Sequence, residues 1–348
     1  MTDLLVLLSS RRSGKEKGLP DLLGLEKAMQ NQFYGFSEEP FALAPDPRFF
    51  FSTENHKEII ESLIYAIGEK DGLILLTGER GSGKTTLIRQ LLMMLPSHIT
   101  AIPVFHPPKS FGELLEGVLR QLNLPPTEGD RNANLSQFND FLHRKSDRGE
   151  TLAIIVDEAQ ELSAEVLEDL RLLCSPDPRR PRLLKEVFVG TPQIEEKLGT
   201  PELRQVNQRI TTRRRLAPLT ELESWQYIEY RLERVNKSVA DIFTPEAMSL
   251  ICSKANGIPQ SLNAICYTAL SAGYALNQKK IDLQLIPRVL SLFGSQQQQP
   301  GRGKPGAAAS LESLLAYIGK SSLLMKISFL LLAYSVLAWI IFFTVALK

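Results

Sequence analysis

The stretch "GLILLTGERGSGKTT" (residues 72–86) decides the fold of this chain. Its first half is an apolar run typical of a strand buried on both faces of a sheet, and its second half matches G-x-x-x-x-G-K-[ST]. Glycines let backbone N–H groups converge on a phosphate, and the helix that follows presents its N-terminus to the same anion. Since the motif follows a strand and opens a helix, we favour a P-loop over a chance glycine-rich turn.

Two side chains of the P-loop have predicted roles of their own. Lys84 is expected to reach the β- and γ-phosphates of ATP, and Thr85 is expected to ligate Mg²⁺. The predicted phosphate-binding residues are Gly78, Glu79, Arg80, Gly81, Ser82, Gly83, Lys84, Thr85 and Thr86.

Strand and helix patterns alternate on both sides of the motif. The other apolar runs expected to be strands are residues 99–105, 151–157 and 183–190, and the helical patterns are near 84–95, 110–122, 134–146 and 163–174. Such alternation predicts an α/β fold with a parallel, doubly wound sheet, which we place at residues 33–217. Residues 218–293 carry helical periodicity only, so a separate all-helical unit is expected there.

The run "LAIIVDEAQ" (152–160) ends in two carboxylates. A buried strand delivers them to the carboxyl edge of the sheet, where open α/β sheets bind their ligands. Asp157 is expected to hold Mg²⁺, directly or through water, and Glu158 to orient and deprotonate the attacking water. A plain helix cap is the alternative for such a pair, but its position after a P-loop favours hydrolysis.

Three further residues are candidates for catalysis. Thr191, in "VGTPQ" (189–193), follows the next strand and is placed to touch the γ-phosphate, although it is equally suited to cap a helix. Arg204 and Arg209 lead into a fifth strand, where an arginine finger for a neighbouring subunit is worth about 10³–10⁵ in rate. A solvated charged face is the alternative for these arginines, and Arg213–Arg215 could instead meet nucleic acid or anionic lipid.

Composition limits the other classes of function. The formal net charge is +1, so no global positive field indicates bulk nucleic-acid binding. The three cysteines, Cys174, Cys252 and Cys266, have no CxxC spacing, which predicts reduced thiols in a cytosolic body.

The two ends of the chain differ from this body. Residues 1–32 are expected to be a weakly ordered extension, and residues 294–324 a flexible linker in which 311–321 forms either an interfacial helix or a plain one. Residues 327–347 carry no charge, and a helix of that length reaches about 31 Å, enough to cross a bilayer. We therefore expect a transmembrane helix at residues 325–348. The basic residues before it predict a single pass of the inner (cytoplasmic) membrane, with the ATPase in the cytoplasm.

Several segments together resemble one family. The N-terminal "PF…PDPRF" block within residues 33–67, the P-loop, "IIVDEAQ", "VGTPQ", "LRQVNQRIT" and "GIPQSLNAICYTAL" are similar to the ExeA/GspA-type AAA+ ATPases. The resemblance implies an AAA+ core with a helical lid, a ring-like homo-oligomer, and a role in driving or licensing assembly of a secretion, pilus or polysaccharide-export complex with an inner-membrane partner. It departs from the family at "GIPQ": Pro259 is followed by Gln260, where the family's arginine contacts nucleotide phosphates.

Two other functions remain open from the sequence. The first is a DNA-binding AAA+ ATPase of the transposition or initiation type, against which the charge balance argues. The second is a membrane scaffold that binds ATP but hydrolyses little of it, for which the neutral Gln260 argues.

Overall fold

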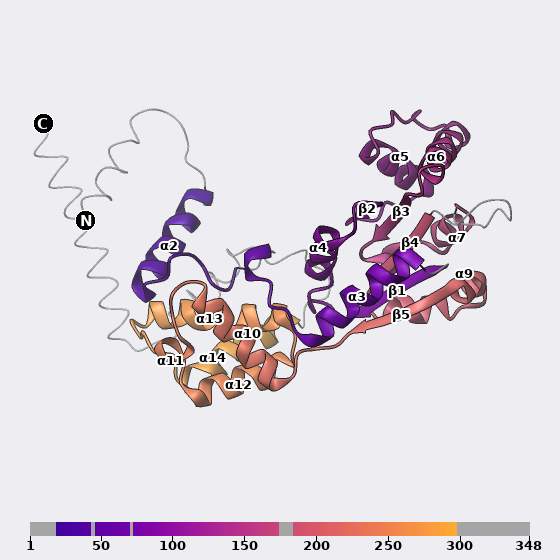
Figure 1. Ribbon diagram of the computed structural model, residues 1–348. Helices are drawn as coiled ribbons and strands as arrows, with labels where there is room; N and C mark the ends of the chain where they lie inside the picture. The colour runs from indigo at the N-terminus through magenta and orange to yellow at the C-terminus, as the bar shows by residue number, and fades with distance from the viewer. Residues whose placement is uncertain (1–18, 43–45, 70–71, 174–183, 298–348) are drawn as a thin grey trace, which may run out of the picture. The chain divides into compact units, whose positions relative to one another are not determined.

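The computed structural model describes residues 19–42, 46–69, 72–173 and 184–297 (Figure 1). A five-stranded parallel sheet in the order β2-β3-β4-β1-β5 forms the centre of the first part. Its strands are β1 (Leu73–Gly78), β2 (Ile99–Val104), β3 (Thr151–Val156), β4 (Leu184–Gly190) and β5 (Ile210–Leu216). The prediction of a parallel α/β fold is confirmed, and the predicted strands lie within one residue of the observed ones.

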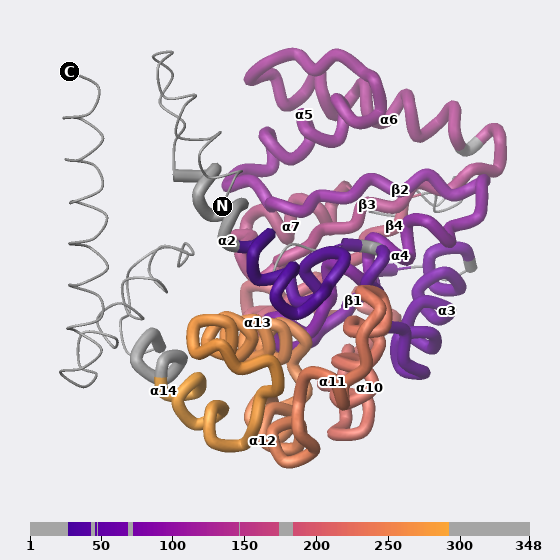
Figure 2. The backbone as a smooth tube through the Cα atoms, turned by 90° about the vertical axis from the view of Figure 1, so that its left-hand side faces the viewer, coloured from indigo at the N-terminus to yellow at the C-terminus, as the bar shows by residue number. Residues whose placement is uncertain are grey.

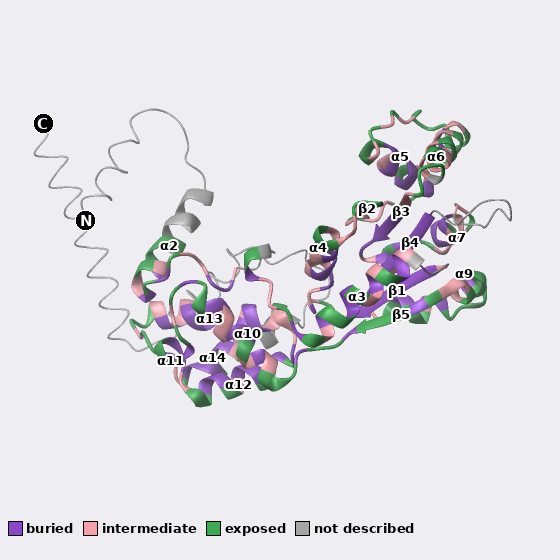
Figure 3. Cartoon of the chain, in the orientation of Figure 1, coloured by how far each residue is buried: buried purple, intermediate pink, exposed green. Residues whose placement is uncertain are grey.

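Helices cover both faces of the sheet, because alternate residues of each strand enter different cores. Leu73 and Leu75 pack in one core with α5, α6, α7, α8 and α9, whereas Ile74 and Leu76 pack in the other with α3 and α4. The central strands are buried along their length, as Figure 3 shows. These helices are α3 (Glu54–Glu69), α4 (Lys84–Met94), α5 (Phe111–Gln121), α6 (Arg131–Ser146), α7 (Ala164–Leu173), α8 (Gln193–Leu198) and α9 (Arg204–Arg209). Short 3₁₀ turns, η2 (Pro47–Phe49), η3 (Ala159–Glu161) and η4 (Pro201–Leu203), connect some of these elements. Figures 1 and 2 place α5 and α6 on the β2 side of the sheet.

An all-helical unit follows β5. Its helices are α10 (Glu221–Glu233), α11 (Val239–Ile242), α12 (Pro245–Ala255) and α13 (Pro259–Ala275). Helix α14 (Leu285–Gln297) comes next in the sequence, and all but its first two residues belong to a second compact unit that begins at Pro287. Thr220 caps α10 through a capping box with Glu223, and Thr244 caps α12 ahead of Pro245.

The turn between α12 and α13 holds the start of this unit in place. Gly257 has φ +68, and a Cβ built there would lie 2.0 Å from the carbonyl oxygen of Leu219. The same two residues share a hydrogen bond, in which the Leu219 N–H donates to the Gly257 carbonyl at 2.9 Å. A residue with a side chain would therefore separate this turn from the segment that enters α10.

The N-terminal part of the described chain differs from the expectation. Residues 19–32 were expected to belong to a weakly ordered extension, but they form most of α2 (Leu19–Tyr34). The Tyr34 hydroxyl donates to the Leu270 carbonyl of α13 at 2.8 Å, and Ser271 Oγ lies 3.4 Å from Gln30 Oε1. These long-range contacts on α13 stabilise a helix whose own periodicity is weak.

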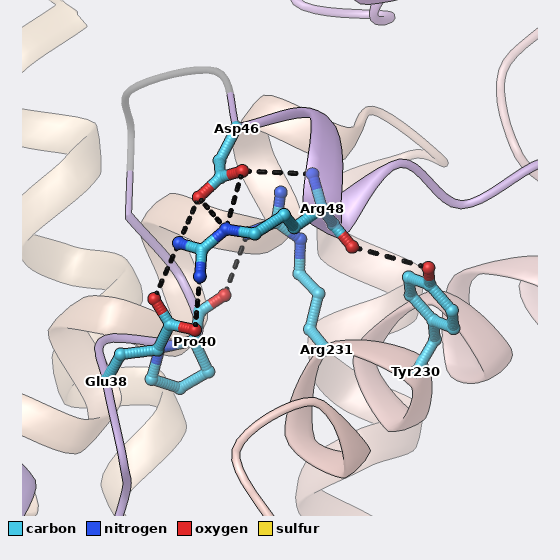
Figure 4. A network of polar contacts seen from close by, with 6 residues as sticks. All are labelled: Glu38, Pro40, Asp46, Arg48, Tyr230 and Arg231. Atoms are coloured by element: carbon cyan, nitrogen blue, oxygen red, sulfur yellow. Dashed lines mark hydrogen bonds and ion pairs between the residues drawn. The ribbon is translucent and has the colours of Figure 1, made fainter.

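The segment between α2 and α3 is bound to helix α10, as Figure 4 shows. Arg231 of α10 is buried, donates to the Pro40 carbonyl at 2.8 Å, and stacks over the ring of Phe49 with 5.2 Å between guanidinium carbon and ring centroid. The loop itself is closed by Arg48, which pairs with both Glu38 and Asp46. The family-specific N-terminal block therefore connects the helical unit to the layer of helices that begins with α3.

No helix of the described ranges is long and apolar enough to cross a membrane. The expected transmembrane helix at 325–348 and the linker from 298 onward lie outside the described residues, as do residues 1–18 and Cys174. Cys252 and Cys266 are buried free thiols, and burial raises the pKa of Cys252 to about 11.

Candidate active site

The P-loop connects β1 to α4 at the carboxyl edge of the sheet. Gly81 and Gly83 both adopt positive φ, +78 and +100, and Gly83 occupies the N-cap position of α4. A Cβ at Gly83 would meet no atom within 4 Å, so the backbone conformation, rather than lack of space, requires glycine there. Turns of this kind direct consecutive backbone N–H groups toward one point, which suits a phosphate group.

Lys84 lies inside this loop. Its side chain is buried, and Nζ donates to the carbonyl oxygens of Gly78 and Glu79, at 3.0 Å each. Burial lowers the pKa of Lys84, and the charges of Glu158 and Asp157 oppose that shift only in part. The ammonium group therefore occupies a site where an anion would stabilise its charge.

The side chain of Thr85, in the first turn of α4, is hydrogen-bonded to that of Asp157, which directly follows β3. Thr85 Oγ1 donates to Asp157 Oδ2 at 2.5 Å, and the backbone N–H of Glu158 donates to Oδ1 at 2.9 Å. Asp157 is 2% exposed, and burial raises its pKa, against the hydrogen bonds from Thr85 and Glu158, which lower it. A carboxylate and a hydroxyl side by side form a pair of hard oxygen ligands of the kind that Mg²⁺ prefers.

The loop fits a Mg²⁺-nucleotide. Ser82 Oγ is buried in the P-loop and has no hydrogen-bond partner within the described residues. A buried hydroxyl without a partner is costly, and a phosphate oxygen is an acceptor that would satisfy it. We infer that Ser82, Lys84 and the loop backbone would hold the phosphates, and that Thr85 and Asp157 would hold the metal.

The pairing of Thr85 with Asp157 predicts a specific defect in a Thr85→Val variant. Nucleotide affinity in the presence of Mg²⁺ should fall roughly tenfold or more, since a lost contact to a charged group costs about 1.5–3 kcal/mol. Affinity in EDTA should stay near that of the unchanged protein. Titration with a fluorescent ATP analogue, with and without Mg²⁺, measures both. Thr268→Val, which removes a helix hydroxyl in α13, is the matched control; equal Mg²⁺ dependence in the two variants would contradict the assignment.

Glu158 has an unusual backbone at the end of β3. Its φ is +53, in the left-handed region that residues with a side chain seldom occupy, at a cost of about 1 kcal/mol or more. Its carboxylate oxygen Oε2 accepts from Gln160 Nε2 at 2.5 Å. Gln160 Oε1 in turn accepts from the backbone N–H of Thr191 at 3.1 Å, so the structure brings Glu158 and Thr191 together through one glutamine.

Gln160 is the site residue that sequence reasoning missed. In the sequence, Gln160 is visible only as a polar residue two positions after Glu158 in "DEAQ". A polar residue on the surface of a helix would give the same pattern. Thr191 itself does not cap α8 with its side chain, because Pro192 occupies the N-cap position and no side-chain cap bond forms.

The helical unit reaches the P-loop through Gln260. Its backbone N–H donates to the Gly81 carbonyl at 3.2 Å, and its side chain lies so close that a Cβ on Gly81 would be 2.4 Å from Gln260 Oε1. Pro259 occupies the first turn of α13 just before it. The structure therefore brings the "GIPQ" segment to the phosphate-binding loop, with an uncharged side chain at the contact.

The two candidate finger arginines, Arg204 and Arg209, are not brought to this P-loop. Arg204 and Arg209 begin and end α9, at the amino end of β5, and the Ile210 end of that strand pairs with Leu73. The P-loop follows the opposite end of β1, about 20 Å away for a strand of this length. Arg209 Nη1 donates to the Arg171 carbonyl at 3.2 Å. Arg213 contacts Asn207 and Arg214 contacts Ser62, whereas Arg215 pairs with Glu79 of the P-loop at 3.4 Å.

The fold and this arrangement define an α/β P-loop domain of the AAA type. A family profile described as "AAA domain" matches residues 67–198. The chain is 37% identical over 257 residues to general secretion pathway protein A of Aeromonas hydrophila, covering 73% of this chain and 46% of that protein. It is thus an AAA domain protein homologous to general secretion pathway protein A, which confirms the resemblance. It spans about half the length of that relative.

Solved structures share the fold at low sequence identity. The Aeropyrum pernix ORC1 protein in complex with DNA aligns with TM-score 0.54 and 14% identity over 83% of this chain and 84% of that one. Cdc6p from Pyrobaculum aerophilum aligns with TM-score 0.53 and 14% identity over 75% of each chain. The Aeropyrum pernix ORC2 protein, solved in ADPNP-ADP complexes, aligns with TM-score 0.51 and 17% identity over 69% of this chain and 68% of that one. At such identities the likeness concerns the fold alone.

Proposed function

We propose that this protein binds and hydrolyses ATP with Mg²⁺. The observation that carries the proposal is the convergence of Lys84, Thr85, Asp157 and Glu158 at one edge of the sheet, directly beside a P-loop with an unsatisfied hydroxyl. The lysine and the loop backbone bind the phosphates, and Glu158 accepts the proton of the attacking water. Mg²⁺, when bound, neutralises phosphate charge.

The remaining candidates complete this proposal. Thr191 contacts the γ-phosphate side of the site, and Pro259 and Gln260 carry the helical lid to the P-loop. Arg204 or Arg209 acts on the nucleotide of a neighbouring copy in a ring-like homo-oligomer. Support for a role in trans is that α9 lies at the sheet edge away from this chain's own P-loop.

The wider role follows from the relative. We propose that the protein is held in the inner membrane by a helix at residues 325–348, with the ATPase in the cytoplasm. It uses ATP to drive or license assembly of a secretion, pilus or polysaccharide-export complex through an inner-membrane partner. Supporting this role are the homology to general secretion pathway protein A and the uncharged run before Lys348.

Removal of residues 322–348 tests the anchor. The full chain is expected to sediment with membranes and to resist extraction by high salt, whereas the shortened chain stays in the supernatant with its ATPase activity retained. Fractionation of cells that express each form, followed by ATPase assays, measures both. A control variant lacking only residues 294–310 should still sediment. Membrane sedimentation of the form without 322–348 would overturn the anchor.

One observation favours a second function, an ATP-switched scaffold with little hydrolysis. The residue of the lid that contacts the P-loop, Gln260, brings no positive charge to the phosphates. Single-turnover hydrolysis by the membrane-bound protein separates the two functions, because a scaffold retains bound ATP over many minutes. ATP-dependent retention of labelled duplex at about 150 mM salt would instead favour a DNA-binding ATPase.

A further inference from the structure

The side chain of Gln160 bridges two segments at the carboxyl edge of the sheet. Its Nε2 donates to Glu158 Oε2 at 2.5 Å, and its Oε1 accepts from the Thr191 backbone N–H at 3.1 Å. The two bonds determine the orientation of the amide, since the carboxylate only accepts and the backbone N–H only donates. Exchange of the amide nitrogen and oxygen would place two acceptors together on one side and two donors on the other.

Gly190 leaves the space that this amide fills. A Cβ at Gly190 would lie 2.6 Å from Gln160 Oε1, whereas its next neighbour, in Ile194, would be 3.4 Å away. The φ of Gly190 is not positive, so an alanine could adopt the backbone conformation. The backbone conformation at residue 190 thus does not require glycine. The close approach of the Gln160 side chain explains why the residue has no side chain of its own.

Helix α8 also holds the backbone around Gln160. Lys197 of α8 donates through Nζ to the Gln160 carbonyl at 3.1 Å, and also to the Leu162 carbonyl. The short 3₁₀ turn Ala159–Glu161 is therefore attached at two points to the segment that follows β4, and a third contact reaches Leu162 just after the turn. The backbone of Glu158 is left-handed and leads into this turn, and its carboxylate accepts from Gln160, which links it to the Thr191 backbone.

We propose that Gln160 is a positioning residue for ATP hydrolysis, which holds the Glu158 carboxylate in a fixed place relative to the Thr191 backbone. The proposal rests on the proposed function, in which Glu158 is the base. Glu158 has three rotatable side-chain bonds, and a fixed carboxylate is needed because misplacing a catalytic group by about 1 Å costs about 100-fold in rate. The bridge also joins the base to Thr191, so a ligand that displaces the Thr191 backbone displaces the base with it.

The test uses Gln160→Ala in the full chain, assayed as the membrane-bound protein. The value of kcat is expected to fall by about 10–100-fold, while KM for ATP and the melting temperature without nucleotide stay unchanged. Gln121→Ala removes an exposed glutamine side chain on α5 and should leave both kinetic constants unchanged.

A double-mutant cycle separates positioning from a structural role. If Gln160 acts through Glu158, then Gln160→Ala should cause no further loss in a Glu158→Gln background, where the base is already absent. An equal additional loss in that background would overturn the proposal. So would a matching fall in melting temperature, which would indicate a general weakening of this edge of the sheet.

Gly190→Ala provides an independent route to the same defect. It keeps the glutamine but pushes its amide away, so kcat should fall as in Gln160→Ala, and the two changes together should cost no more than either alone. Full activity of Gly190→Ala would overturn the proposal. If instead Glu158→Gln itself hydrolysed ATP normally, the proposed function would fail, which is a distinct outcome from failure of Gln160 alone.

Discussion

Replacing Lys84 with alanine is expected to abolish detectable ATP hydrolysis and to weaken ATP binding by at least about 100-fold. The ammonium group is the buried cation of the P-loop, and removing one preorganised donor to an oxyanion typically costs about 10²–10³ in rate. Steady-state phosphate release and titration with a fluorescent ATP analogue measure the two losses. Lys84→Arg is expected to fare little better, because the larger planar group does not fit between the Gly78 and Glu79 carbonyls.

The Lys84→Ala substitution should not lower the stability of the nucleotide-free protein. Burial lowers the pKa of Lys84, which means that folding disfavours its charged form. In the folded state Lys84 binds protons less readily than in the unfolded chain. The charged lysine therefore lowers the free energy of unfolding at every pH below its folded pKa, and this cost falls as the pH rises above that pKa. Removal of the amine should therefore leave the nucleotide-free melting temperature unchanged or higher, and abolish the rise caused by Mg²⁺-ATP. Lys57→Ala, at an exposed lysine of α3, should keep that rise. A lower nucleotide-free melting temperature for Lys84→Ala would contradict this account.

Glu158→Gln is expected to bind Mg²⁺-ATP with nearly unchanged affinity and to hydrolyse it about 10²–10⁴-fold more slowly. The amide oxygen still accepts from Gln160, so the geometry is kept while the proton acceptor is lost. Rapid-quench measurement of a single turnover reports the chemical step directly, and retained nucleotide after gel filtration reports the binding.

The control for this variant lies three residues away. Glu161→Gln changes an exposed carboxylate at the end of the same 3₁₀ turn and should hydrolyse ATP at the rate of the unchanged protein. Equal rates for Glu158→Gln and the unchanged protein would refute the assignment of the base. Slow hydrolysis by both variants would indicate that the turn, rather than one carboxylate, limits the reaction.

Local signals predicted much of the fold. The strands could be placed because apolar residues on both faces are needed in a doubly covered sheet, as in β1, where Leu73 and Ile74 enter opposite cores. The predicted starts of helices were less accurate where an N-cap residue sets the start. Helix α6 begins at Arg131, three residues before the predicted start at 134, because Asp130 accepts a hydrogen bond from the Ala133 N–H. Helix α2 was missed because its stabilising contacts come from α13, more than 230 residues away.

The candidate site was predictable in its parts but not in its connections. Lys84, Thr85, Asp157 and Glu158 follow from motifs whose spacing reflects chemistry, and the structure places them together. Gln160 could not be inferred, because its importance depends on how closely β3 and β4 approach at Gly190. The direct contact of Gln260 with Gly81 likewise depends on where the helical unit folds back.

The two outermost strands limit how the sheet can grow. In β2, Pro103 has no N–H to donate, and its carbonyl already accepts from Gln121 Nε2 at 3.2 Å. In β5, three consecutive exposed arginines would face like charges from a second copy of the same strand. Both edges therefore resist templated addition of a further strand, which protects the chain from amyloid-like stacking at high local concentration. In the proposed ring-like assembly, copies of this chain would therefore associate through helices and loops rather than through a shared sheet.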